Sequence, residues 1–192
     1  MKREYELSNV AKDYLSRFYD ILDEMIAEMS GAELTGSISH NFIVQMIPHH
    51  RAAIEMSRNL LQYTTNVPLQ EIALNIISEQ TESIENMRAI QQCCSEKVNC
   101  PRDVKLYQRR VHQIMQVMFS AMGNAGASNN INEDFIREMI PHHEGAIRMS
   151  RNGLQYEICS ELRPILQAII TSQEKGVREM KRLLAEMERK NC

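Results

Sequence analysis

The chain has 192 residues, 43% of them hydrophobic and 24% charged, which is typical of a globular protein long enough to bury a core. Its formal net charge is −3 and it has no basic stripe, which argues against a nucleic-acid partner, because phosphate backbones require clustered Lys and Arg. No segment approaches the 18 uncharged apolar residues of a membrane span, and the first seven residues lack the apolar stretch of an export signal. We therefore expect a soluble protein of the cytoplasm, without a membrane partner.

Two copies of one unit follow each other without a gap. The sequence Met-Ile-Pro-His-His occupies positions 46–50 and recurs at 139–143, an offset of 93. The same offset aligns further identical residues: Phe42 with Phe135, Met56 with Met149, Gln80 with Gln173, and Met87 with Met180. We interpret the chain as two tandem repeats, residues 1–99 and 100–192, that share one core.

Three helices are predicted in the first repeat. Apolar residues at alternating spacings of four and three predict a helix from Val10 to Met29. A loop rich in Gly and Ser follows at 30–37, and Ser39 is the expected N-cap of a second helix. A third helix is predicted from Leu69 to Cys93.

The second repeat is expected to follow the same plan. Its loop lies at 123–130, Asn132 stands where Ser39 stands in the first repeat, and its last helix is predicted from Leu162 to Met187. Long helices joined by short loops must pack side by side to bury their apolar stripes. The expected fold is all-α, a ferritin-like helical bundle in which the two three-helix repeats are related by a pseudo-twofold axis. The second and third helices of both repeats should form its centre.

The second helix of each repeat carries the residues with chemical potential. Phe42, His49 and Met56 fall on one line at seven-residue spacing, so the first histidine of the pair should point into the core. His50 lies beside Met46, four residues away, at the edge of the same stripe. His142 and His143 hold the equivalent positions in the second repeat, and the two pairs should face each other across the axis.

A glutamine occupies a core position of the third helix in both repeats, at Gln80 and Gln173. An unpaired buried amide or imidazole costs about 1 to 3 kcal/mol, so each should have a partner. We therefore expect His49 to bond with Gln80, and His142 with Gln173.

Five cysteines are an odd number, and none occupies matching positions in the two repeats: Cys93, Cys94, Cys100, Cys159 and Cys192. Such a set does not suggest a disulfide framework. Free thiols in a reducing cytoplasm are the expectation.

Met-Ile-Pro-His-His, followed by Met seven residues after the first histidine, and Gln-x-x-x-Ile/Val-x-x-Met on the next helix make the chain resemble the DUF305 family in both repeats. The family consists of small helical proteins described as ferritin-like. The resemblance implies a four-helix-bundle architecture and, for some members, binding of copper or silver through Met and His.

Three functional hypotheses follow. The first is a non-enzymatic binder of a soft transition metal, most plausibly copper, because thioether sulfur and imidazole suit soft Cu(I). Its proposed ligands are Met46, His49, His50, Met56, Met87, Met139, His142, His143, Met149 and Met180, with Gln80 and Gln173 in supporting positions. The second is a structural or protein-interaction bundle without metal, in which Met is adaptable core filler and the histidines are satisfied core groups. The third is a di-iron oxidase, but no histidine follows a glutamate at the required spacing of three residues.

Overall fold

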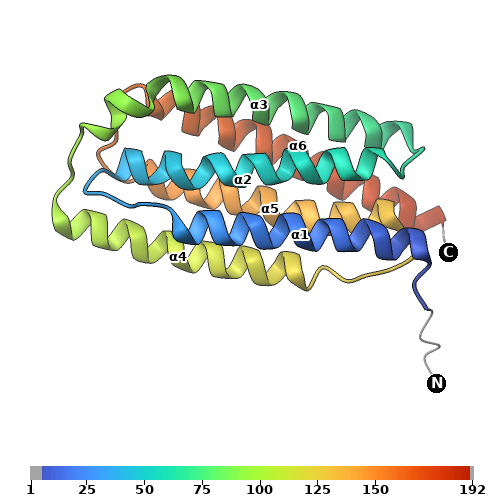
Figure 1. The fold of residues 1–192 in the computed structure, drawn as a ribbon. Coiled ribbons are helices and arrows are strands. Elements are labelled where there is room, and N and C mark those ends of the chain that lie inside the picture. The colour runs from blue at the N-terminus through green and yellow to red at the C-terminus, as the bar shows by residue number, and fades with distance from the viewer. Residues whose placement is uncertain (1–5, 191–192) are drawn as a thin grey trace.

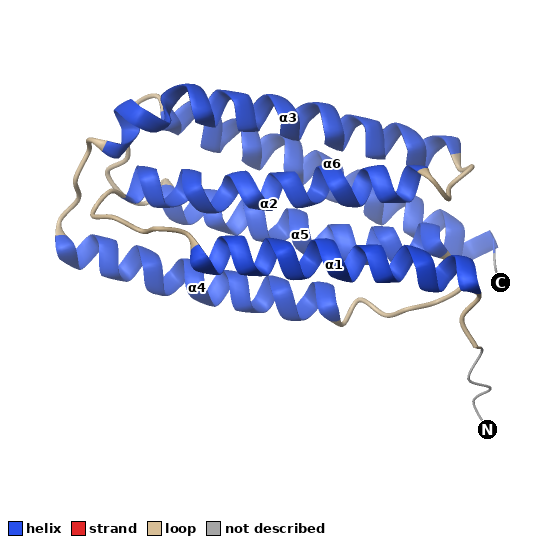
Figure 2. Ribbon diagram, viewed as in Figure 1, coloured by secondary structure: helices blue, strands red, loops and turns tan. Residues whose placement is uncertain are grey.

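The structure is a computed structural model that describes residues 6–190. Cys192 lies outside the described residues, and so do five of the first seven residues, in which the sequence analysis found no export signal. Helices and loops account for all of the described residues, with no strand among them (Figures 1 and 2). The helices are α1 (Asn9–Gly31), α2 (Ile38–Leu61), α3 (Val67–Ser95), α4 (Pro101–Gly123), α5 (Ile131–Gly153) and α6 (Leu162–Lys190). The predicted all-α class is confirmed, and the predicted helix bounds differ by only a few residues.

The six helices form three layers of two (Figure 1). The middle layer contains α2 and α5, which contact each other. One side of this layer is covered by α3 and α6, and the other by α1 and α4. Each covering helix packs on the middle helix of its own repeat, and one hydrophobic core includes residues of all six helices. The faces of α2 and α5 that contact the covering helices are therefore shielded from water on both sides of the middle layer.

The N-caps of the middle helices lie two residues before the predicted ones. Ser37 caps α2 by accepting a bond from the backbone N–H of His40 at 3.2 Å, and Asn130 caps α5. Ser39 lies inside the first turn of α2, where its hydroxyl accepts a bond from the N–H of Cys159 at 2.9 Å. The prediction of Ser39 and Asn132 as caps was wrong: residues of the same capping types, Ser37 and Asn130, stand two positions earlier and bond the N–H groups of the first turn.

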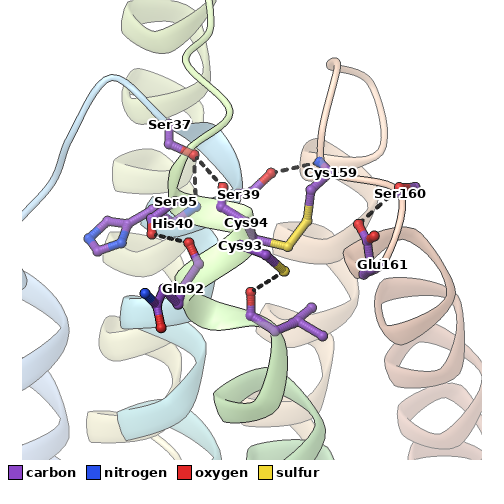
Figure 3. Close-up of a disulfide and its surroundings, with 11 residues drawn as sticks. Ser37, Ser39, His40, Gln92, Cys93, Cys94, Ser95, Cys159, Ser160 and Glu161 are labelled. Atoms are coloured by element: carbon purple, nitrogen blue, oxygen red, sulfur yellow. Dashed lines mark hydrogen bonds between the residues drawn. A yellow bond between two sulfur atoms is a disulfide. The ribbon is translucent and has the colours of Figure 1, made fainter.

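Cys94 and Cys159 form a disulfide with a Cα–Cα distance of 5.4 Å, so the expectation of free thiols was wrong for this pair (Figure 3). The antiparallel packing brings the end of α3 against the loop before α6, although the two cysteines are not at matching repeat positions. Cys93 and Cys100 are free and exposed. Disulfides persist in oxidising compartments, so the cysteine content does not indicate a reducing cytoplasm.

None of the helices in the described part of the chain combines the length and the apolar character that crossing a membrane requires.

Candidate metal centre

Four imidazoles form a row across the middle of the bundle. His49 of α2 and His142 of α5 stack with their ring centroids 3.7 Å apart, where the two repeats meet. His50 and His143 extend the row on either side, with centroid distances of 5.8 Å to His49 and 5.9 Å to His142, respectively. All four side chains are buried, at 2% exposure or less. The two histidine pairs therefore face each other, as the periodicity predicted.

The two stacked imidazoles hold each other through reciprocal bonds to the backbone. Nε2 of His49 lies 3.2 Å from the carbonyl oxygen of His142, and Nε2 of His142 lies 3.0 Å from that of His49. A carbonyl oxygen only accepts, so each Nε2 must carry the proton and donate it. In a neutral imidazole this leaves Nδ1 with a free lone pair, and Nδ1 of both rings is buried without a partner.

Burial keeps these imidazoles neutral. It is the largest cause that lowers the pKa of His50 to about 3 and that of His142 to about 4. Burial likewise lowers the pKa of His49 and of His143 well below 6.5, and the nearby imidazole of His142 lowers both further. Around neutral pH all four rings are therefore uncharged, which is the state in which imidazole binds a metal.

The outer imidazoles face α3 and α6. Nε2 of His50 lies 3.0 Å from the hydroxyl of Ser83 on α3. The repeat equivalent of Ser83 is Gly176 on α6, and a Cβ built there would lie 3.1 Å from Nε2 of His143. Because Gly176 has no side chain, it leaves room for the imidazole of His143. The hydroxyl of Ser83 instead lies within hydrogen-bond distance of the imidazole of His50.

The predicted bonds between histidine and glutamine do not form. His49 and His142 use each other's carbonyl groups, and both amide atoms of Gln80 and the amide oxygen of Gln173 lack a partner. The physical reason is the close approach of α2 and α5, which places a backbone acceptor nearer to each ring than the third helix could. Both glutamines remain buried, at 1% and 2% exposure, and line a cavity beside His50.

The pairing of α2 with α3 sets the level of Met87 along the bundle. His50 on α2 lies opposite Ser83 on α3. Met46 stands four residues before His50, and Met87 stands four residues after Ser83, each about one helical turn away. The two helices run antiparallel, so these methionines lie at the same level. On α5 and α6, His143 lies opposite Gly176, so Met139 and Met180 likewise lie at one level.

The pairing of α2 with α5 brings in one further methionine on each side. Phe42 lies near Gly153 at one end of this contact, and His49 stacks on His142 in its middle. Met149 is therefore within about one helical turn of the level of Met46, and Met56 within about one turn of the level of Met139. By their levels along the bundle the six methionines divide into two groups, each with members from both repeats: Met46, Met87 and Met149 in the first, and Met139, Met180 and Met56 in the second. All six side chains are at most 1% exposed.

Carboxylates, thiols and imidazoles alone do not converge on a metal position in this row. Within residues 6–190, three such ligand atoms come within 4.8 Å of one another only at Cys94, Cys159 and Glu161, where both sulfurs belong to the disulfide. The carboxylate–histidine cluster of a di-iron oxidase is thus not found in the described residues. A metal at the imidazole row would therefore need further ligands of another kind, such as methionine sulfur.

Comparison with known proteins agrees with this architecture. The family described as a domain of unknown function, DUF305, matches residues 39–184 in a single stretch that includes both histidine pairs. The chain belongs to the DUF305 family. No curated protein sequence matches this DUF305 chain.

Two solved structures resemble this DUF305 protein along most of its length. CopM in the Cu(II)-bound form is 26% identical with a TM-score of 0.59, covering 78% of this chain and 97% of that one. A DUF305 fragment from Deinococcus radiodurans is 20% identical with a TM-score of 0.57, covering 78% of this chain and 96% of the fragment. The fragment supports the fold alone.

A buried acid between α1 and α5 was missed by the sequence reasoning. The hydroxyl of Tyr14 donates to Oε2 of Glu138 at 2.6 Å, while Oε1 of Glu138 has no partner. Burial, with a smaller contribution from Asp134, raises the pKa of Glu138 to about 8 against the lowering effect of the Tyr14 bond. The repeat equivalent of Glu138 is Gln45, so a difference between repeats at a core-facing position was the available signal.

Replacing this acid with the residue of the other repeat gives a first prediction. The pKa of Glu138 is raised on folding, so its contribution to stability is complete below pH 4.5 and is lost as the pH rises through 8. The unmodified protein should lose about 1 kcal/mol of its free energy of unfolding per pH unit between pH 6.5 and 8 through this group, and Glu138→Gln should not show that loss. Urea unfolding of both proteins at these two pH values checks it, and an unchanged pH difference would contradict a protonated Glu138.

Proposed function

We propose that this DUF305 protein is a non-enzymatic binder of a soft transition metal, copper, held by methionine sulfur and imidazole nitrogen. The observation that carries the proposal is the pair of unpartnered Nδ1 atoms on His49 and His142. Metal-binding histidines usually donate their other ring N–H to a carbonyl or carboxylate, which fixes the tautomer and ring orientation. The reciprocal bonds to the backbone supply such a carbonyl for both rings.

The donor set supports copper in particular. Thioether sulfur favours Cu(I) and imidazole accepts copper in either oxidation state, whereas Mg²⁺ and Mn²⁺ prefer carboxylates. The similarity to CopM, whose structure contains Cu(II), points in the same direction. The proposed ligands are those of the sequence hypothesis, distributed as two positions: Met46, Met87 and Met149 with His49 and His50, and Met139, Met180 and Met56 with His142 and His143. Gln80 and Gln173 are outer groups that line the adjoining cavity.

This arrangement makes the two repeats interdependent. Each methionine group contains members of both repeats, so neither 1–99 nor 100–192 alone supplies a complete set of the proposed ligands. We accordingly propose that the two repeats form one functional unit, ferritin-like in its helical architecture. With its buried disulfide, the protein is proposed to work in an oxidising compartment, in place of the cytoplasm expected from the sequence.

A structural bundle without metal is the competing function, and one observation favours it. The reciprocal bonds of His49 and His142 satisfy one nitrogen of each ring without any ion. In that case the imidazole row would only fix the packing register of α2 against α5, and the methionines would be adaptable core filler.

Titration with Cu(I) in ascorbate tests the proposal. The background variant replaces the free thiols Cys93 and Cys100, and also Cys192, with Ser, while the disulfide is retained. We expect two Cu(I) ions per chain and a higher melting temperature, since binding at 100 times Kd adds about 2.7 kcal/mol to the native state. A chromophoric Cu(I) chelator in competition gives the affinity.

Conservative variants identify the ligands. Met46→Leu with Met139→Leu keeps the core volume but removes one sulfur from each group, and should weaken Cu(I) binding at least about tenfold. The matched control is Met115→Leu, because Met115 is buried and its repeat equivalent is already Leu22. If Cu(I) does not stabilise the background protein, the metal-free bundle remains as the function. Stabilisation retained in full by the double Met variant would instead exclude Met46 and Met139 as ligands.

A further inference from the structure

The imidazole row opens to the outside in a groove between α3 and α6. A cavity of about 380 Å³ in this groove is lined by His50 and, around it, by Gln80, Gln173, Glu79, Glu82 and Ala168. The inner histidines His49 and His142 are fully buried. An ion that reaches the inner rings from this side must therefore pass His50 or its repeat equivalent.

The other end of the row opens far less. Around His143 the corresponding cavity measures only about 10 Å³, and it is lined by Lys175, Gly176 and Asn75 among others. Glu79 and Ser172 line both cavities and so lie between them. The two cavities are thus neighbouring ends of one groove, and they differ greatly in size.

Divergence between the repeats explains the difference in charge and shape. Glu82 beside His50 is replaced by Lys175 beside His143, at the same repeat position. Ala168 in the wide cavity corresponds to the larger Asn75 in the narrow one. The wide end is lined by Glu79 and Glu82 without Lys or Arg, whereas at the narrow end Lys175 offsets the charge of Glu79 and Glu179, so the wide end attracts cations more strongly.

A polar group without a partner also lines the wide end. Gln80 is 1% exposed, and neither its amide nitrogen nor its amide oxygen has a hydrogen-bond partner. The amide oxygen of Gln173, in the same cavity, is likewise unpartnered. Amide oxygens can replace water molecules around a cation, so these two groups offer an intermediate position between the acidic rim and His50.

We propose that the wide end of the α3–α6 groove, at His50, is the port through which the metal ion enters and leaves the imidazole row. Glu79 and Glu82 collect the cation, the amide oxygens of Gln80 and Gln173 take the place of its water ligands, and Nε2 of His50 receives it. The inference rests on the proposed function, and it adds the direction of transfer and the residues that control its rate.

Blocking each end separately tests the port. Ala168→Phe fills the wide cavity, and Asn75→Phe is the matched change at the same repeat position of the narrow end; both sites are exposed, so the core is untouched. Protein loaded with Cu(I) is mixed with excess chromophoric chelator, at concentrations where the transfer rate no longer depends on chelator. We expect Ala168→Phe to slow release about tenfold or more and Asn75→Phe to leave it unchanged, with equal equilibrium affinities.

A charge reversal tests the acidic rim independently. Glu82→Lys reproduces the residue of the narrow end and should slow uptake of Cu(I) supplied as its cationic acetonitrile complex. The slowing should vanish near 1 M salt, where charges are screened within about 3 Å. Glu85→Lys, exposed on α3 outside the cavity lining, is the control.

The outcomes separate the port from the function. Slowing by Asn75→Phe instead of Ala168→Phe, or by neither variant, would overturn the port while copper binding stands. If the unmodified protein binds no Cu(I) in the equilibrium titration, the proposed function itself fails, and the port with it.

Discussion

Lowering the pH from 6.5 to 5.5 is expected to reduce the free energy of unfolding of the metal-free protein by about 3 kcal/mol. The cause is the row of four buried imidazoles, whose pKa values folding lowers, to about 3 for His50 and about 4 for His142. Unfolding returns each ring to an ordinary pKa near 6.5. Below that pH the unfolded chain binds protons that the native protein does not, so stability is present above pH 6.5 and is lost as the pH falls.

The magnitude follows from counting protons. Four histidines together would cost about 4 kcal/mol over this interval, and Glu138 offsets about 1 kcal/mol because it is already protonated in the native state. A loss of this size is a large fraction of the 5 to 15 kcal/mol typical of a domain. We therefore expect cooperative acid unfolding to begin above the range in which most carboxylates titrate.

Urea unfolding at pH 7.5, 6.5 and 5.5, in the presence of a chelator, measures the effect. His143→Gln should reduce the difference between pH 6.5 and 5.5 by about 1 kcal/mol, the contribution of one imidazole. His112→Gln is the control, since His112 is exposed on α4 and should leave the difference as it is. Equal stability at pH 6.5 and 5.5 would show that the histidines are not buried in neutral form.

Removal of the Cys94–Cys159 disulfide is expected to cost about 4 kcal/mol, because the bond closes a loop of 65 residues in the unfolded chain. It joins the end of α3 to the loop before α6, and so connects the two repeats directly (Figure 3). The variant Cys94→Ala with Cys159→Ala should unfold at correspondingly lower urea. Reduction of the unmodified protein with a dithiol should produce a similar loss.

The exposed cysteines provide the control for this prediction. Cys93→Ala with Cys100→Ala should change the stability by no more than about 0.5 kcal/mol, as is usual for exposed positions. If the disulfide variant were as stable as this control, the bond would contribute nothing and the α3–α6 contact would be held by packing alone.

The sequence was sufficient for much of the fold and for part of the site. Apolar periodicity is a local property, so it predicted the helices and placed His49 and His142 in the core. The constant offset of 93 between repeats predicted that the two histidine pairs face each other, and the stacking of His49 on His142 at 3.7 Å agrees with that prediction.

Details that depend on competing partners required the tertiary structure. The sequence offered Gln80 as the partner of His49, but the close contact of α2 and α5 supplied the carbonyl of His142 instead. A backbone acceptor has no signature in a sequence, since every residue carries one.

Long-range contacts between unlike positions were also outside the reach of the sequence. The Cys94–Cys159 bond and the bond from Tyr14 to Glu138 both join residues at non-equivalent repeat positions. Only the antiparallel packing of the helices brings such pairs within reach.

The sequence by itself thus determined six amphipathic helices, their duplication and the burial of the histidine pairs, because these follow from local spacing of apolar residues. The tertiary structure decided which atoms the histidines bond, which cysteines pair, and that only the His50 end of the row opens into a wide acidic groove. Those features depend on the distance between helices and on small differences between the repeats, such as Ala168 against Asn75, whose effect appears only when α3 and α6 are packed together.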